Sequence, residues 1–307
     1  MRDIKHNLKH LFPTIFSYLH EMRMAIYRLI GRFSPVLLIQ IWYSNVHHEK
    51  INLENPQTLD EKINWLKLNG NISLWTRCAD KYLVRDYVEE KGLESTLNTL
   101  YGVYEKPCDI DFEALPDSFV LKTNNGGGGK NVLIVRDKSK LNQDDARKKL
   151  GRWLRAKPWL MYYEPQYKGI KPKIIAERYL GGLDEDTPLN DIKINCVNGK
   201  AYSVLICSDR ELGVHSSYSE FDLDWNLHNE CIAPEYRTDK YIPKPVALDR
   251  LIEYSEILSE DIPFVRVDWY EILGEPVFGE MTFTPSGGFD SSYVLKYQRE
   301  LGAKIKI

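Results

Sequence analysis

The sequence predicts an α+β fold, with helices at the front of the chain followed by antiparallel strands and further helices. Apolar residues recur at helical spacing over roughly the first 90 positions. From Ser118 onward, short β-branched runs appear, and turn residues join several of them in pairs. The 307 residues, 43% of them hydrophobic, suffice for two or three units with their own cores.

The first segment, residues 1–33, predicts a basic amphipathic helix. Its apolar residues recur every three or four positions, and six lysines and arginines outnumber Asp3 and Glu21. Such a helix can lie on an anionic membrane surface. Because apolar stripes usually face a core, we expect this one to pack on its own chain. Peripheral membrane contact through residues 1–45 stays open as the alternative.

Two further helices are predicted between residues 55 and 94. In "TLDEKINWLKLN", Thr58 and Glu61 have the spacing of a capping box, which marks the start of a helix. The stretch "CADKYLVRDYVEEKGLE" predicts one continuous helix. We expect it to end at Gly92, since glycine accepts the left-handed conformation common after a helix.

The remaining elements alternate between strands and helices. "SFVLK", "NVLIV" and "KIIAERYL" predict strands, with a helix over "DDARKKLGRWLRA" between the last two. "DIKINCVNGKAYSVLICSD" predicts two strands joined at Asn198-Gly199, a strong hairpin signal. A helix over "VALDRLIEYSEILSE" then precedes a last strand pair, "FVRVDWYEI" and "VFGEMTF".

Composition excludes several classes of protein. A net charge of −3 and a pI near 6.2 do not suit a nucleic-acid-binding protein. The five scattered cysteines form no CxxC pair, which favours reduced thiols in a cytoplasm over disulfides or a zinc site. We find no convincing signal peptide, and the apolar stretch "PVLLIQIWY" is too short to span a bilayer.

The stretch "FVLKTNNGGGGKNVLIV" carries the first functional signal. Four consecutive glycines lie between two predicted strands, with Lys122 on the entering strand and Lys130 closing the loop. Glycine lets backbone N–H groups approach a ligand closely, and a lysine beside such groups completes an anion cradle. A Walker loop or a dinucleotide fingerprint would open a helix, whereas a strand follows here. A phosphate-covering flap and a merely flexible hairpin tip both remain possible.

The second signal is the hairpin "RVDWYEILGEPVFGEMT". With the turn centred on Gly274, antiparallel pairing places Asp268 opposite Glu280 and Arg266 opposite Thr282, all on one face. Facing carboxylates repel, so they favour a cation or a shared proton, and Mg²⁺ bound together with phosphates would fit. A register slip or a solvated acidic pair is the alternative. Together with the glycine loop, the hairpin favours ATP chemistry.

At this point the chain resembles the TupA-like ATP-grasp family of surface-polysaccharide and teichuronopeptide biosynthesis. The resemblance runs from about Asn55 to about Ser292. It rests on six stretches in order: "TLDEKINWLKL", "ADKYLVRDYV", "FVLKTNNGGGG", "AERYL", "DIKINCVNGK" and "RVDWYEILGEPVFGEMTFTPSGG".

The resemblance implies an ATP-grasp fold, in which two α+β subdomains clamp ATP. We expect a helical extension over residues 1–50 and the N-terminal part of the fold over 51–115. A small glycine-flap subdomain over 116–180 and a C-terminal body with the metal site over 181–307 would follow.

The resemblance also implies roles for single residues. Lys81 and Lys122 match the two phosphate-binding lysines of the family. Glu177 matches the residue that meets the adenine amino group. The glycine flap that covers the β- and γ-phosphates in the family is matched by Gly126, Gly127, Gly128 and Gly129. The backbone that contacts the edge of the adenine ring is matched by Arg178, Tyr179 and Leu180.

Further matches concern catalysis and the metal. Asp191 and Lys193 match the "DxK" strand that faces the triphosphate, and Arg266 matches the arginine that steadies the acyl-phosphate or tetrahedral intermediate. Catalysis is assigned to Lys193 and Arg266. Asp268 and Glu280 match the Mg²⁺ ligands. At the position of Thr282, general ATP-grasp enzymes carry an asparagine that binds the metal. We expect the threonine hydroxyl to bind the metal more weakly than that asparagine does.

The resemblance implies an ATP- and Mg²⁺-dependent carboxylate–amine ligase that forms an amide through an acyl-phosphate. The expected partners are a small-molecule or glycan carboxylate, such as a uronic acid, and an amine donor such as an amino acid. "FTPSGGFDSS", which follows Glu280, is expected to border the acceptor pocket. We expect a cytoplasmic protein, and the oligomeric state stays open.

Three other functions remain possible. The same ATP site could phosphorylate a sugar hydroxyl. The DxD in "FDLDW" could bind the metal of a nucleotide-sugar glycosyltransferase, although so short a pattern is more often a turn. The chain could also be a non-catalytic scaffold, held to membrane enzymes by residues 1–45.

Overall fold

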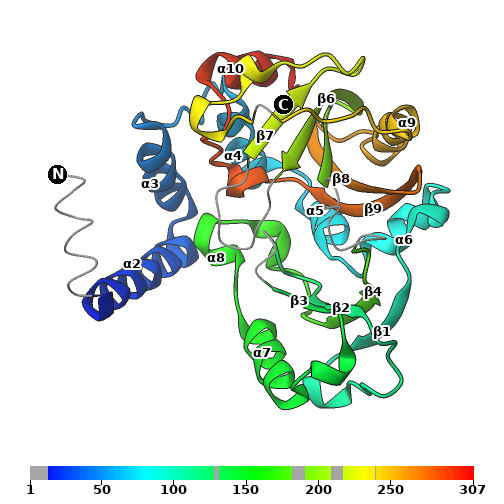
Figure 1. Cartoon of the computed structure of the whole chain (residues 1–307). Helices are drawn as coiled ribbons and strands as arrows, with labels where there is room; N and C mark the ends of the chain where they lie inside the picture. The colour runs from blue at the N-terminus through cyan, green and yellow to red at the C-terminus, as the bar shows by residue number, and fades with distance from the viewer. Residues whose placement is uncertain (1–12, 128–130, 182–190, 209–216, 239) are drawn as a thin grey trace.

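Two antiparallel sheets organise the chain (Figure 1). The computed structural model describes residues 13–127, 131–181, 191–208, 217–238 and 240–307. The small sheet has the order β1-β4-β2-β3, with the strands β1 (Leu100–Tyr104), β2 (Phe119–Thr123), β3 (Val132–Val135) and β4 (Ile174–Arg178). The large sheet has the order β7-β6-β5-β8-β9, with the strands β5 (Asp191–Val197), β6 (Lys200–Ser208), β7 (Ser217–Phe221), β8 (Phe264–Ile272) and β9 (Glu275–Thr282).

Helices precede, connect and cover the sheets. The α-helices are α2 (Pro13–Phe33), α3 (Pro35–His47), α4 (Leu59–Asn69), α5 (Ile72–Ala79), α6 (Val84–Glu90), α7 (Gln143–Arg155), α8 (Trp159–Tyr162), α9 (Leu248–Leu258) and α10 (Leu295–Lys304). Short 3₁₀ turns are η1 (Glu94–Thr96), η2 (Pro107–Asp109), η3 (Lys138–Lys140), η4 (Pro165–Tyr167), η5 (Asn229–Cys231), η6 (Pro234–Tyr236) and η7 (Pro285–Gly288). In Figure 1, α7 covers the small sheet and α9 lies against the large one.

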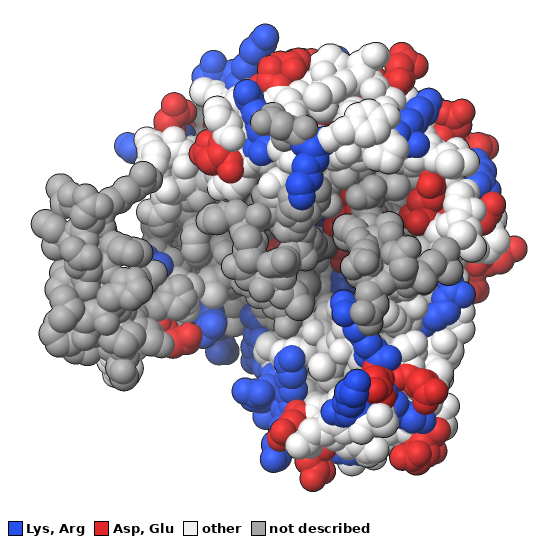
Figure 2. Space-filling model, viewed as in Figure 1, with Lys and Arg blue, Asp and Glu red and all other residues white. Residues whose placement is uncertain are grey.

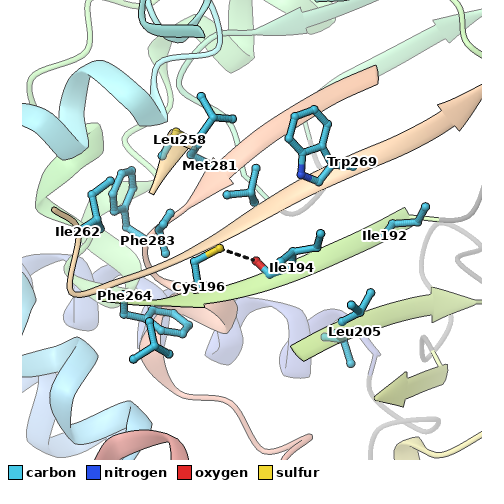
Figure 3. Packing of buried hydrophobic residues seen from close by; sticks show 14 of the residues in the cluster. Ile192, Ile194, Cys196, Leu205, Leu258, Ile262, Phe264, Trp269, Met281 and Phe283 are labelled. Carbon is cyan, nitrogen blue, oxygen red and sulfur yellow. Dashed lines mark hydrogen bonds between the residues drawn. The ribbon is translucent and has the colours of Figure 1, made fainter. Parts of the chain in front are cut away.

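The large sheet has one apolar and one polar face. Strand β5 alternates Ile192 and Ile194 on the first face with Asp191 and Lys193 on the second, as the period of two requires. Figure 3 shows the apolar side, where Trp269 and other residues of β5, β8 and β9 pack in one cluster. A smaller core under the other sheet joins β2 and β4 to α7. The buried polar face is therefore the unusual one, and it carries the predicted site residues.

Most predicted elements are confirmed. The capping box is complete, because Glu61 N donates to Thr58 Oγ1 at 3.2 Å and Thr58 N donates to Glu61 Oε2 at 3.0 Å. Asn198 and Gly199 have φ of 50° and 76°, as a tight hairpin turn between β5 and β6 requires. Strands β1 and β7 were not predicted. Both are edge strands with mixed polar and apolar residues, so they lack the apolar run of a central strand.

One predicted helix is interrupted. The stretch predicted as continuous from Cys78 forms α5 and α6, separated by Asp80–Leu83. Asp80 Oδ1 accepts hydrogen bonds from the backbone N–H groups of Tyr82 at 2.8 Å and Leu83 at 3.2 Å. These side-chain hydrogen bonds hold the backbone after Asp80 in a turn, which explains the break. Gly92, with a φ of +75°, ends the segment as predicted.

The boundaries of the four predicted segments stay predictions. Strand β1 lies in the segment predicted as 51–115, yet it pairs with β4 of the segment predicted as 116–180. The small sheet therefore begins at Leu100 and takes in residues on both sides of position 116.

The N-terminal helix α2 does not bury its apolar stripe. It contacts α3 and α8 through a narrow face that includes the buried Met24 and Gly31. Ile26 and Leu29 are 52% and 59% exposed, so the expectation that this stripe packs on its own chain was wrong. Among the helices of the described ranges, none is both long and apolar enough to cross a membrane. On the face drawn in Figure 2, the described residues carry charges of both signs, in keeping with a small net charge.

Candidate active site

The hairpin of β8 and β9 brings the two predicted metal ligands together. Asp268 pairs with Glu280 and Arg266 pairs with Thr282, as predicted. The turn differs from the prediction: Leu273 and Gly274, with φ of 53° and 78°, form a two-residue loop. If the strands paired regularly from this loop, Asp268 would lie opposite Gly279. The Glu280 side chain would then lie on the opposite face of the sheet.

A β-bulge at Gly279 restores the predicted pairing. The register shifts between Asp268 and Trp269, so that Trp269 pairs with Phe278 and Gly279 is the extra residue. A Cβ atom on Gly279 would lie 2.7 Å from the Asp268 carbonyl oxygen, which no side chain tolerates. The prediction was correct because the bulge compensates for the shift of the turn.

Three strands place charged side chains in one row. Lys193 on β5 pairs with Asp268 on β8, which pairs with Glu280 on β9. Lys193 Nζ lies 2.6 Å from Asp191 Oδ2 and 2.7 Å from Asp268 Oδ2. Arg266 donates to both Asp268 oxygens, at 2.7 and 2.8 Å. Such two-pronged pairs between a guanidinium and a carboxylate are strong and geometrically specific.

Lys81 reaches the same row from outside the sheet. It lies in the break between α5 and α6 and forms an ion pair with Glu280. Lys81 N donates to Asn124 O at 3.0 Å, and Asn124 Nδ2 donates to Asp80 Oδ2 at 2.9 Å. The end of β2, just before the glycine run, is thereby attached to the segment that carries Lys81.

Charge is balanced within this cluster, and the balance shifts pKa values. Burial alone would raise the pKa of Glu280, but Lys81, and after it Lys193 and Arg266, holds that pKa well below its usual range. For Arg266, burial opposes the charged form, but the carboxylates of Asp268, Asp191 and Glu280 together outweigh burial and raise the pKa above its ordinary value. Both groups therefore stay ionised near neutral pH.

The glycine loop is described only in part. Gly128 and Gly129, and with them Lys130, lie outside the described residues. At Gly126 a Cβ atom would lie 2.9 Å from Asn131 Cβ, so this glycine allows the two sides of the loop to approach. A Cβ atom at Gly127 would lie 3.5 Å from the Tyr167 hydroxyl.

Lys122 and Glu177 lie together in the small sheet. Lys122 Nζ is 2.6 Å from Glu177 Oε2, and Arg85 lies 3.9 Å from the same carboxylate. Arg178 N donates to Thr99 O at 2.9 Å, and Arg178 O accepts from Asn98 at 2.9 Å. The backbone of Arg178 is thus already hydrogen-bonded within the protein.

Sequence reasoning missed a group of α4 residues that hold the segment after β9. Lys67 is 1% exposed and donates to Asn64 Oδ1 at 2.9 Å, Tyr162 O at 3.1 Å and Gly287 O. Asn64 Nδ2 donates to Gly288 O at 2.7 Å. The signal was present as polar residues, Asn64 and Lys67, on the buried side of a capped helix.

This support matters because η7 has an unusual backbone. Ser286, Gly287 and Gly288 have successive φ values of 50°, 70° and 81°. A left-handed conformation is costly for serine, so surrounding contacts must maintain it. Burial lowers the pKa of Lys67 to about 7, opposed by Glu164 and Asp60.

Tyr167 of η4 is a second residue that the sequence did not reveal. Burial raises its pKa well above the ordinary value, and the carboxylates of Glu164 and Glu280 add to the effect. The phenol is therefore a neutral group between the glycine loop and the charged row.

The DxD pair forms a turn. Asp222 Oδ1 accepts from the N–H groups of Asp224 at 3.0 Å and Asn226 at 2.8 Å, and Asn226 Nδ2 donates to Asp222 Oδ2. An aspartate that binds the following backbone in this way is typical of an Asx-turn. Within the described ranges, no cluster of three or more His, Cys, Asp and Glu side chains could hold a metal.

Comparison with known proteins gives one family. The model of the family "TupA-like ATPgrasp" matches residues 61–306. No curated protein matches the chain.

Solved structures show more distant likenesses. A D-alanine–D-alanine ligase from Bacillus anthracis is 18% identical, with a TM-score of 0.43 over 75% of this chain and 65% of that one. An ADP complex of N5-carboxyaminoimidazole ribonucleotide synthetase is 15% identical, with a TM-score of 0.46 over 73% and 50%. The chain spans less than two thirds of the length of these enzymes.

The bulge at Gly279 can be tested by Gly279→Ala. Because the methyl group would meet the Asp268 carbonyl at 2.7 Å, we expect the free energy of unfolding to fall by about 1–3 kcal/mol in urea titrations. Gly151→Ala in α7 is the control, since its Cβ would lie 3.6 Å from the nearest atom, and alanine favours helix. Equal stability of Gly279→Ala and wild type would contradict the steric argument.

The burial of Lys67 predicts a pH dependence. Because its pKa is lowered to about 7 in the folded chain, the unfolded chain binds more protons between pH 7 and 10. We therefore expect the difference in unfolding free energy, wild type minus Lys67→Met, to increase as the pH rises. The expected slope is about 1 kcal/mol per pH unit. Lys148→Met, at an exposed site on α7, is the matched control. A flat difference for Lys67→Met would refute the lowered pKa of Lys67.

Proposed function

The chain belongs to the TupA-like ATPgrasp family and has the ATP-grasp fold; from that premise we propose that it is an ATP-dependent carboxylate–amine ligase. One observation carries the proposal. Lys81, Lys193 and Arg266 converge on the opposed carboxylates Asp268 and Glu280, on one buried face of the sheet. A site with this much fixed charge suits the handling of phosphate groups.

The proposed reaction has two steps. A carboxylate oxygen of the acceptor attacks the γ-phosphorus of ATP, the bond to the β-phosphate oxygen breaks, and ADP leaves. The amine nitrogen then attacks the carbonyl carbon of the acyl-phosphate, phosphate leaves, and the nitrogen loses a proton to give the amide. No covalent nucleophile from the protein is required, so positioning and charge neutralisation account for the catalysis.

The ion pairs suggest how the protein responds to ATP. Lys81 is held by Glu280, while Lys193 is held by Asp191 and Asp268. Phosphate oxygens would compete for these ammonium groups, and Lys81, with one carboxylate partner, is the easier to recruit. Arg266, fixed by two bonds to Asp268, would keep its place and stabilise negative charge on the transferred group.

Asp268 and Glu280 fit a magnesium ion in their chemistry. Both offer hard oxygen ligands from directly opposed positions, and the Glu280 side chain is 32% exposed. Bound Mg²⁺ would neutralise phosphate charge. Thr282 donates its hydroxyl to Glu280 Oε1 at 3.2 Å, so we propose that it orients this carboxylate and contributes little as a ligand.

For the nucleotide, we propose that Lys122 passes from Glu177 to the phosphates under the glycine flap. Glu177 would then accept from the adenine amino group. The backbone N–H and C=O groups of Arg178 are already hydrogen-bonded to Thr99 and Asn98. We therefore assign the contact with the edge of the adenine ring to Tyr179 and Leu180. The proposed acceptor is a uronic-acid carboxyl in surface-polysaccharide biosynthesis, and the proposed amine is an amino acid.

The role of Lys81 gives the sharpest test of the site. We expect Lys81→Met to lower kcat/KM for ADP release by about 100-fold or more, because a charge at the phosphates is lost. Lys91→Met is the matched control, since Lys91 pairs with Glu260 at the surface and should leave the rate unchanged. The measurement is ADP release with ATP, Mg²⁺, uronic acids and amino acids.

Product analysis distinguishes the proposed ligase from the alternatives. Mass spectrometry should find an amide, with one ADP and one phosphate for each amide formed. A stable phosphoester would make the protein a sugar kinase, and binding of a nucleotide sugar without ATP would make it a glycosyltransferase. Tight ATP binding without ADP release for any substrate pair would leave only the scaffold function.

A further inference from the structure

The strongest feature outside the site is the outward face of α2. Large apolar side chains along it are exposed, from 45% at Met22 to 74% at Phe33. The exposed apolar residues of α2 are Tyr18, Leu19, Met22, Ile26, Leu29 and Phe33. Exposed apolar surface on this scale marks an interaction site.

The geometry of α2 separates this face from the part that packs. At about 100° per residue, Met24, Tyr27 and Gly31 share one side of the helix. Gly31 allows close contact there, since a Cβ atom would lie 2.8 Å from the Leu160 carbonyl of α8. Ile26 and Leu29 lie roughly opposite that side, at about half a turn. The helix is therefore held against the body by one edge and presents its apolar face outward.

Charge flanks the apolar face on both sides. Arg23 lies along one edge of it, and Arg28 and Arg32 lie along the other; all three are exposed. Within α2 and α3, Glu21 is the one acidic residue. The apolar surface continues past the helix end, where Val36 and Leu37 of α3 are 41% and 45% exposed.

A second basic surface lies near α2. Lys148, Arg152 and Arg155 recur at helical spacing on the exposed side of α7. Figure 2 shows blue side chains gathered at the lower left of the described surface, where Figure 1 places α7. The chain runs from α7 directly into α8, which contacts α2. This local positive charge stands out in a protein with a net charge of −3.

We propose that the outward face of α2 docks on an anionic lipid membrane surface. Helices of this composition, apolar on one face with arginines at its margins, lie in the interface with their apolar side chains among the acyl chains. The arginines at the edges, and those of α7, would meet lipid phosphates.

A second copy of the chain fits this face less well. A helix of 21 residues is about 30 Å long and about 10 Å wide, which gives roughly 300 Å². A stable dimer buries about 800 Å² on each partner.

The test is co-sedimentation of the full chain with vesicles of phosphatidylcholine, with and without phosphatidylglycerol. We expect binding to the anionic vesicles, weakened by salt and by removal of phosphatidylglycerol. The triple variant Ile26→Gln, Leu29→Gln, Phe33→Gln should reduce binding by about tenfold or more, and so should Arg28→Gln with Arg32→Gln. Because these side chains are exposed, circular dichroism and ATP binding should not change.

Tyr241→Gln is the matched control, since Tyr241 is 89% exposed and lies outside α2 and α3. It should bind vesicles as wild type does. Three results would overturn the proposal: no binding to anionic vesicles, equal binding of the triple variant and wild type, or a wild-type dimer that the triple variant dissociates in analytical ultracentrifugation. None of these readouts depends on ligase activity.

Discussion

The repulsion between two facing carboxylates, Asp268 and Glu280, is the constraint on which this site depends. Adjacent antiparallel strands bring their Cβ atoms to about 5 Å, where like charges are unfavourable unless cations intervene. Here Lys193 and Arg266 surround Asp268, and Lys81 reaches Glu280 from another part of the chain. Under the proposed function, phosphate or metal would replace one of these partners, so the arrangement that relieves the repulsion would also make the site responsive to both.

Lys81 also joins the charged row to the glycine loop. Its backbone is bonded to Asn124, which is 0% exposed and also accepts from Lys173 N at 2.7 Å. The start of the glycine loop, Lys81 and the carboxylate pair are therefore connected through one set of contacts. On the other side of the row, α4 holds η7 through Asn64 and Lys67. The residues around the site are thus fixed by contacts from segments far apart in the sequence.

Local patterns were enough to predict what depends on neighbours in sequence. The capping box of α4 and the turn at Asn198-Gly199 follow from spacing alone. The pairing of Asp268 with Glu280 was also predicted, but it depends on the bulge at Gly279, which the spacing did not reveal. What depends on tertiary contacts was not predictable: Asp80 breaks a helix because Asn124 and the following N–H groups bind it. Lys67 is buried because the carbonyls of Gly287 and Tyr162, both far from it in sequence, accept its hydrogen bonds. The apolar stripe of α2 was assigned to a core because sequence cannot show on which side a helix packs.

We propose that Asp268 and Glu280 form a metal site that works together with bound ATP. A Mn²⁺ titration followed by electron paramagnetic resonance, with and without ATP, tests this proposal on wild type, Asp268→Asn and Glu280→Gln. ATP should strengthen Mn²⁺ binding to wild type, and each substitution should weaken that binding by about tenfold or more. Mn²⁺ binding in the presence of ATP that is equally tight in all three proteins would contradict it.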